Sequence, residues 1–186
     1  MPLSTKLDKR NEEIKIYING EFFHRDQAKI SVFDSGFLLG DGIWEGIRLV
    51  NNSWLFLDEH LDRLYEGCKA IDIRLDEDKK FLTNAIIETQ KINNITDAAH
   101  ARVMVTRGNK IKPFQQPSLS KDGINLVIIM EHSEEHPNTD GVKLVTVPQV
   151  RGLPMSQDPK LNSHSKLNCI IACIQACLLY TSPSPR

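Results

Sequence analysis

The sequence lacks an excess of charge of either sign. Its 186 residues include 23 Lys and Arg residues and 24 Asp and Glu residues, which gives a net charge of -1. Proteins that bind nucleic acids usually carry a basic excess, because they neutralise phosphates. We therefore expect no nucleic-acid partner.

A long hydrophobic run is also missing. No apolar stretch approaches the roughly 20 residues that a membrane-spanning helix requires, and the mean hydropathy is -0.31. Residues 1–10 contain no apolar core of a secretory signal. These absences predict a soluble, cytoplasmic protein that has no membrane partner.

Cysteine is scarce, with only four residues, and their distribution is not that of a disulfide framework. Cys68 stands alone, and Cys169, Cys173 and Cys177 are four residues apart, which places them on one stripe of a helix. A structural zinc site usually adds histidines or a second cysteine pair. We predict small buried helix residues rather than a metal site.

One further metal pattern occurs in the sequence. His132-Ser-Glu-Glu-His136 matches the H-x-x-E-H arrangement of some zinc proteases, which requires a helix to bring both histidines to one ion. Here the pattern runs into Pro137, which disfavours a helix. It is therefore interpreted as a solvated linker.

What is present is an ordinary globular composition, with 40% hydrophobic and 25% charged residues. Apolar alternation and turn residues predict strands, and apolar residues three and four apart predict helices. The predicted strands are 14–18, 21–23, 43–50, 53–57, 101–106, 124–130 and 142–147. Two predicted helices begin after caps at Asp58 and Asp76, and a third covers 166–176. Strands, two helices and further strands indicate an α+β domain.

The same features predict two domains. Residues 1–131 form the N-terminal α+β domain, the polar stretch 132–141 is an interdomain linker, and 142–176 begin a C-terminal domain. The final residues, 177–186, end in Ser-Pro-Ser-Pro, which cannot continue a helix. They also resemble translated sequencing-adaptor sequence, so they are predicted to be a non-native tail.

The densest motif lies between Ser31 and Arg48 and reads SVFDSGFLLGDGIWEGIR. Its glycines allow the backbone to approach a ligand closely. Alternate residues of the following strand share a face, with Trp44, Gly46 and Arg48 on one side and Ile43, Glu45, Ile47 and Leu49 on the other. Taken alone, this pattern predicts a tight turn into a half-buried strand.

Combined with 16–21 (IYINGE), 58–65 (DEHLDRLY) and 103–108 (VMVTRG), this motif resembles the N-terminal domain of class IV aminotransferases. That pyridoxal-phosphate fold includes branched-chain and D-amino-acid aminotransferases and aminodeoxychorismate lyase. The resemblance ends in the helix before Cys177. It implies an N-terminal fragment, in which the small domain is followed by the truncated start of the large domain that binds pyridoxal 5'-phosphate.

The resemblance also implies roles for three residues. Arg63 occupies the arginine of the family's Glu-His-Leu-x-Arg-Leu motif, which binds the cofactor phosphate, and guanidinium groups suit phosphate oxygens. Arg107 matches an arginine near the substrate carboxylate in the D-amino-acid branch. Leu39 stands where the family often has an aromatic wall of the substrate pocket. Surface charges remain the alternative interpretation of both arginines.

The catalytic lysine of the family is missing from its usual position. It follows an Arg-x-x-Pro-x-x-x-Asp-Pro-x-x stretch, here 151–161, and the next residue is Asn162. We expect Lys166, one helical turn further on and flanked by polar residues, to be the catalytic lysine. Lys160 is an alternative, and so is a solvated lysine that carries no catalysis.

The function that the resemblance implies is transfer of an amino group between an amino acid and a 2-oxo acid, of the branched-chain or D-amino-acid type, by a homodimer. Two alternatives remain open. One is a lyase of the aminodeoxychorismate type that uses the same cofactor. The other is a non-catalytic binding domain that has lost its lysine.

Overall fold

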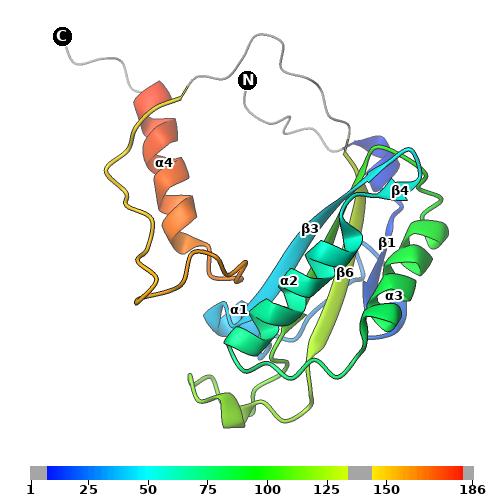
Figure 1. The fold of residues 1–186 in the computed structure, drawn as a ribbon, viewed down its shortest axis with the longest axis horizontal. Helices are drawn as coiled ribbons and strands as arrows, with labels where there is room; N and C mark the ends of the chain where they lie inside the picture. Colours follow the sequence, from blue (N-terminus) through cyan, green and yellow to red (C-terminus); the bar gives the residue numbers. More distant parts are fainter. Residues whose placement is uncertain (1–7, 134–143, 182–186) are drawn as a thin grey trace.

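The computed structural model describes residues 8–133 and 144–181. Six antiparallel strands form one sheet in the order β2-β1-β6-β5-β3-β4 (Figure 1). The strands are β1 (Lys15–Ile18), β2 (Glu21–His24), β3 (Gly42–Val50), β4 (Ser53–Trp54), β5 (Ala99–Thr106) and β6 (Asn125–His132). The helices are η1 (Lys9–Asn11), α1 (Ser35–Leu39), α2 (Leu57–Ala70), α3 (Lys79–Ile92), η2 (Pro117–Leu119) and α4 (Leu167–Thr181).

Two predicted hairpins are confirmed. Asn19 and Gly20 connect β1 and β2 with φ angles of 50° and 98°, and Asn51 and Asn52 connect β3 and β4 with φ angles of 49° and 60°. A two-residue turn with positive φ matches the right-handed twist of the strands that it joins. Asparagine and glycine tolerate this conformation better than other residues.

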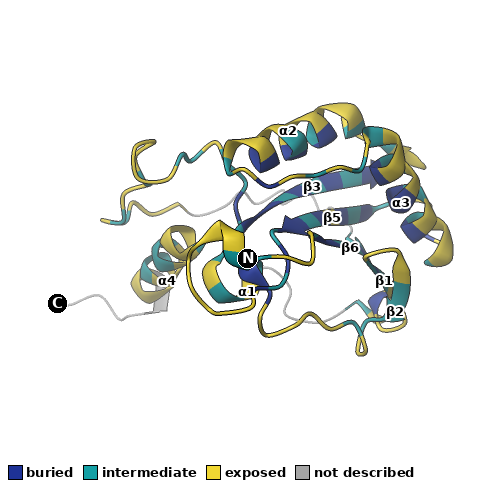
Figure 2. Cartoon of the chain, turned by 90° about the horizontal axis from the view of Figure 1, so that it is seen from below, coloured by how far each residue is buried: buried dark blue, intermediate teal, exposed yellow. Residues whose placement is uncertain are grey.

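The core lies between the sheet and the helices α2 and α3, which cover one of its faces (Figures 1 and 2). The alternation of β3 brings Ile43, Ile47 and Leu49 to this face, where each is fully buried. Leu61 and Leu64 of α2 meet them and are equally inaccessible. The α+β interpretation is therefore correct. Glu45 belongs to the same buried face, as the alternation predicts.

Both predicted helix caps are wrong by a few residues. Helix α2 begins at Leu57 after Phe56, whose φ is 53°, so Asp58 lies inside the first turn. The cap of α3 is Asp78, which accepts a hydrogen bond from the Phe81 amide at 2.7 Å. Leu75 packs against the core in a segment without regular secondary structure, so the helix begins beyond Asp76.

The predictions for the second region have mixed outcomes. Residues 144–147 contain no strand, because no described strand lies beside them to complete a ladder, and Val142 and Lys143 lie outside the described residues. Most of the predicted linker, including His136, also lies outside them. Helix α4 continues to Thr181, into the segment predicted to be a non-native tail. Residues 182–186 are not among the described ones.

The cysteine prediction holds for Cys68 but is wrong for α4. Cys68 of α2 is buried in the core, whereas Cys169, Cys173 and Cys177 are exposed on α4, which lies apart from α2 and α3 (Figure 1). Within residues 8–133 and 144–181, no cluster of His, Cys, Asp and Glu could hold a metal ion. No helix in this part of the chain is long and apolar enough to cross a membrane.

A short backbone contact joins the second region to the sheet. Asn162 O accepts a hydrogen bond from the Trp44 amide at 2.8 Å, and Gly42 O accepts one from the His164 amide at 2.9 Å. Together they make a bridge between Ile43 and Ser163. Gly42 makes the approach possible, because a Cβ there would lie 2.6 Å from Val105 O and 3.1 Å from the His164 ring.

Candidate active site

A buried carboxylate is the centre of the polar groups at this junction. Glu45 projects from β3 onto the apolar face and has no exposed surface. Burying a carboxylate costs free energy unless it is paired and hydrogen-bonded. Its partners come from two elements: Arg63 and His60 lie on the first turns of α2, and Asn162 lies in the segment beside β3.

Arg63 binds Glu45 through one edge of its guanidinium. Nε donates to Oε1 and Nη2 donates to Oε2, both at 2.6 Å, while His60 Nδ1 lies 2.9 Å from Oε2. Burial raises the pKa of Glu45, but the hydrogen bonds from Arg63 and His60 outweigh burial, so the net pKa is lowered. The hydrogen bonds that Arg63 donates to Glu45 raise the pKa of Arg63. Glu45 is therefore held as a carboxylate.

The other side of Arg63 is accessible. Its side chain is 53% exposed, and Nη1 has no hydrogen-bond partner within the described residues. A guanidinium fixed along one edge and open at the other can bind an oxyanion with little loss of side-chain entropy.

Asn162 and Lys166 continue the polar chain that begins at Glu45. Asn162 Nδ2 lies 3.5 Å from Glu45 Oε1, and Asn162 Oδ1 accepts a hydrogen bond from Lys166 Nζ at 3.3 Å. The amine of Lys166 thus reaches the end of the Asn162 side chain. Lys160, in contrast, is exposed, and its backbone amide binds Asp158.

Trp44 forms an aromatic wall beside Lys166. Its indole Nε1 donates to Ser163 O at 3.2 Å, which fixes the ring against the segment that carries Lys166. Lys166 Nζ lies 5.3 Å from the ring centroid, and the Arg102 guanidinium lies 4.2 Å from it. Both cations are within the range of a favourable cation–π interaction. Arg102 has no acidic partner among the described residues.

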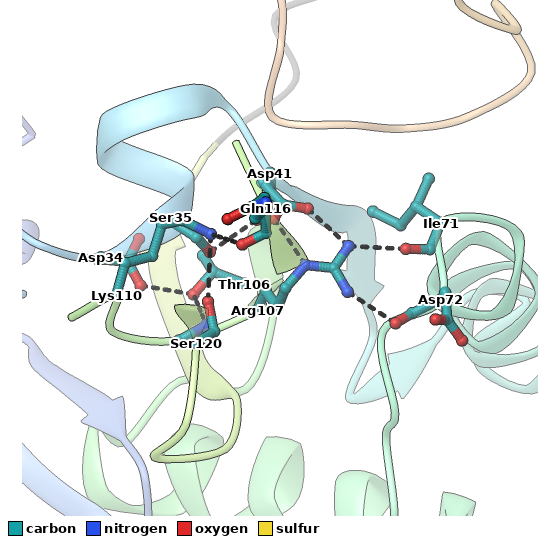
Figure 3. Close-up of polar contacts among 11 residues, drawn as sticks. Asp34, Ser35, Asp41, Ile71, Asp72, Thr106, Arg107, Lys110, Gln116 and Ser120 are labelled. Carbon is teal, nitrogen blue, oxygen red and sulfur yellow. Dashed lines mark hydrogen bonds and ion pairs between the residues drawn. The ribbon is translucent and has the colours of Figure 1, made fainter. Parts of the chain in front are cut away.

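Arg107 belongs to a different network, which Figure 3 shows. Its Nε and Nη2 donate to the Asp41 carboxylate at 2.7 and 3.0 Å, and Nη2 and Nη1 donate to the carbonyls of Ile71 and Asp72 at 2.7 Å. The side chain is only 13% exposed. The structure therefore does not join Arg107 to Arg63 and Lys166, and its predicted contact with a substrate carboxylate stays a prediction.

Leu39 lies at the end of α1, close to the Lys166 segment. It is 38% exposed, and Gly40 after it has a φ of 69°. A Cβ on Gly40 would lie 3.1 Å from the Cα of Ser165, so the turn packs directly against this segment. The predicted place of Leu39 in a pocket wall remains a prediction.

The sequence reasoning missed Glu45, His60 and Arg102 as site residues. Glu45 left one signal, since it is the only charged residue on an otherwise apolar strand face. Arg102 left none, because an arginine on an exposed strand position is common. Arg102 lies on β5 and Trp44 on β3, and these strands are paired in the sheet but distant in sequence, so no local pattern joins the two residues.

A half-open guanidinium and a primary amine at one junction define a class of site, namely one suited to an anionic compound with a carbonyl group. The comparisons identify the family. The family model described as "Amino-transferase class IV" matches residues 42–178, and the chain belongs to this family.

Curated relatives extend the comparison. The chain is 37% identical, over 164 residues, to the putative branched-chain-amino-acid aminotransferase of Methanocaldococcus jannaschii, covering 88% of this chain and 56% of the relative. It is 29% identical to the D-alanine aminotransferase of Staphylococcus haemolyticus, covering 75% of this chain and 49% of that one. A branched-chain-amino-acid aminotransferase-like protein of Arabidopsis thaliana is 32% identical, with 89% of this chain and 30% of the relative covered. The chain thus spans between about a third and just over half the length of these relatives.

Solved structures show the same fold. The branched-chain aminotransferase from the archaeon Thermoproteus uzoniensis, solved with norvaline, aligns with a TM-score of 0.75 at 21% identity, covering 87% of this chain and 55% of that one. A branched-chain amino acid aminotransferase solved with pyridoxamine 5'-phosphate gives a TM-score of 0.80 at 20% identity, with 90% and 57% covered. The expectation of a class IV aminotransferase fold is confirmed.

Proposed function

We propose that this chain is the part of a pyridoxal-phosphate-dependent aminotransferase that contributes the small domain and one edge of the active site. The carrying observation is the junction itself, where the open side of Arg63 and the amine of Lys166 belong to one polar chain through Glu45 and Asn162. Arg63 and Lys166 would hold pyridoxal phosphate, and the bound cofactor would supply the aldehyde chemistry that carries an amino group from an amino acid to a 2-oxo acid.

The residues present fit this cofactor. Arg63 offers to a phosphate the edge of its guanidinium that no described residue binds, and its hydrogen bonds to Glu45 keep that edge in one orientation. Lys166 supplies a primary amine, which Asn162 and Trp44 hold at the junction. Asn162 itself has an amide and cannot form a covalent bond with an aldehyde as an amine does.

Lys166 is the proposed catalytic lysine. Its amine is the one that contacts the side chain at the family's lysine position, whereas Lys160 makes no such contact among the described residues. In its neutral form, the same amine can remove a proton from the α-carbon of a substrate. A chain that binds the cofactor without transamination is the competing proposal.

The test is reductive trapping. Borohydride treatment of the full-length protein with pyridoxal phosphate should leave a pyridoxyl group on the peptide that contains Lys166, identified by mass spectrometry. Lys166→Ala should lose the label and the transamination, and Lys160→Ala is the matched control that should keep both. A label on Lys160 would contradict the assignment. Cofactor binding without any label would favour the non-catalytic alternative.

Arg102 is the more accessible candidate for a substrate carboxylate. Arg102 is exposed and lies over the Trp44 ring, and its guanidinium makes no hydrogen bond or ion pair with any described residue, whereas Arg107 is bound by Asp41 and two carbonyls. A carboxylate can bind Arg102 without breaking an ion pair. The relatives include both branched-chain and D-alanine aminotransferases, so either kind of amino acid suits the proposal.

A homodimer is part of the proposal. Apolar side chains gather on two segments that are joined by a hydrogen bond from the Lys110 amide to Phe33 O. The exposed ones are Val32, Phe33, Phe37, Ile111 and Phe114. Exposed apolar side chains on neighbouring segments are typical of a protein interface. Analytical ultracentrifugation of the full-length protein, with Phe37→Glu as the disrupting variant, tests the assembly.

The cytoplasm remains the proposed location. Cys68, Cys169 and Cys173 carry free thiols, and Cys169 and Cys173 are exposed. Exposed thiols persist in a reducing compartment and tend to oxidise outside one. Cell fractionation with an antibody against the protein would test this location.

A further inference from the structure

Glu45 has a feature that its packing does not explain. It is the one charged side chain on the face of β3 that packs against α2, and it is fully buried there. A buried ion pair is weak support for stability, because apolar residues of similar size often replace one without loss. The position of Glu45 therefore calls for a reason beyond packing.

The geometry of its partner supplies that reason. Arg63 presents its Nε and Nη2 to the two oxygens of Glu45, both at 2.6 Å, so the plane of the guanidinium is fixed by two bonds. His60 and Asn162 approach the same carboxylate at 2.9 and 3.5 Å and keep it from rotating. Nη1 is the nitrogen of Arg63 that no described residue binds.

We propose that Glu45 is a positioning residue that holds Arg63 with Nη1 toward the phosphate of the bound cofactor. The inference rests on the proposed function, in which Arg63 binds that phosphate. Without Glu45, Arg63 would lose both bonds that orient it. A long side chain that is 53% exposed would then sample many rotamers. Ordering it again on binding would weaken the affinity for phosphate.

Charge alone predicts the opposite change in phosphate affinity when Glu45 is removed. Glu45 is an anion close to the phosphate partner, so its removal would raise the local positive potential and tighten phosphate binding. Orientation predicts weaker binding. The direction of the change therefore separates a positioning residue from a simple neutralising one.

The experiment uses two probes that cannot bond covalently to a lysine, pyridoxine 5'-phosphate and pyridoxine. Their dissociation constants for the full-length protein give the contribution of the phosphate alone, independently of Lys166. Glu45→Gln should weaken the binding of pyridoxine 5'-phosphate by about tenfold, which is the scale of one charge-assisted hydrogen bond. The dissociation constant of pyridoxine should not change. In a protein that already carries Arg63→Gln, adding Glu45→Gln should not weaken the binding of pyridoxine 5'-phosphate any further.

Two further variants complete the test. Asp62→Asn is the matched control, because it removes a carboxylate next to Arg63 that pairs with Lys79 instead. It should change neither constant. Glu45→Asp keeps the charge but draws it back from Arg63, so it should reproduce the loss for pyridoxine 5'-phosphate if Glu45→Gln fails to fold.

The outcomes are distinct. If Glu45→Gln weakens the binding of both probes equally, Glu45 has a structural role. If it tightens the binding of pyridoxine 5'-phosphate, Glu45 acts through its charge. Either result overturns the inference. A wild-type preference for the phosphorylated probe that survives Glu45→Gln overturns the inference and leaves the role of Arg63 intact. No preference in the wild-type protein would overturn the role of Arg63 and, with it, that of Glu45.

Discussion

The sheet region, 8–133, and the region of α4, 144–181, are stabilised in different ways. The sheet region buries its apolar side chains between β3, β5 and the helices α2 and α3. The α4 region has a mostly exposed helix, and it is attached to the sheet by the bridge at Ile43 and by contacts of Trp44 and Glu45 (Figure 2). The proposed active-site groups lie where the two regions meet, so both regions contribute to the proposed site.

The largest expected effect is in the core of the sheet region. Leu64→Ala removes a fully buried side chain and should destabilise the chain by about 2–5 kcal/mol. Ile174→Ala on α4, where the side chain is 53% exposed, should change the free energy of unfolding by about 0.5 kcal/mol or less. Urea unfolding of the 186-residue chain measures both values. Equal losses would contradict the distinction between the two regions.

Gly42→Ala should act on both regions at once. The new Cβ would lie 2.6 Å from Val105 O in the sheet and 3.1 Å from the His164 ring. Such crowding typically costs about 1–3 kcal/mol. Gly152→Ala is the control, because its nearest atom would be 3.6 Å away. Thermal unfolding and amide exchange at Trp44 would show the loss, and an unchanged Trp44 amide would refute the close approach.

Acid should loosen the junction before it loosens the core. Burial lowers the pKa of His164 below its ordinary value of 6.5. A group whose pKa is lowered on folding contributes stability above its unfolded pKa and loses it as the pH falls through the folded one. Below pH 6.5, exchange of the Trp44 amide should therefore accelerate relative to that of the Val103 amide.

His164→Asn should abolish this pH dependence. His100→Asn is the control, since burial and the charges of Arg102 and Arg48 also lower the pKa of His100, which lies on β5. Retention of the pH dependence in His164→Asn, or its loss in His100→Asn, would assign the effect to another group.

The smallest effect concerns thiol reactivity. Burial raises the pKa of Cys68 to about 12, whereas Cys169 and Cys173 are exposed on α4. A thiol reagent should modify the α4 cysteines of the native chain quickly and Cys68 only after unfolding, because the thiolate is the reactive form. Peptide mass spectrometry after a short reaction would measure this, and early modification of Cys68 would contradict its burial.

Much of the sheet region was predictable because its signals are local. The alternation in 43–50 predicted which face of β3 is buried, and asparagine and glycine predicted both hairpin turns, since these residues tolerate positive φ. Helix starts were less accurate. A cap depends on where the preceding segment packs: Leu75 packs against the core, and the cap of α3 is Asp78 instead of the predicted Asp76.

The family and the motif position of Arg63 came from the sequence, since they depend on residue order alone. The sequence also marked Asn162 as the place where a lysine is missing. It left Lys160 and Lys166 as alternatives. The sequence alone does not show which of these two lysines, six residues apart, has its amine beside Asn162.

Only the tertiary structure brought Lys166 to Asn162, Asn162 to Glu45 and Glu45 to Arg63. These contacts join β3, α2 and a segment whose Asn162 is 117 residues from Glu45, and no local pattern encodes a contact over such a separation. Burial decided the role of Glu45 as well, because the same carboxylate would be an ordinary surface charge on the opposite face of the strand. The physical reason is that a carboxylate removed from water requires partners, and the fold alone determines which side chains are close enough to be those partners.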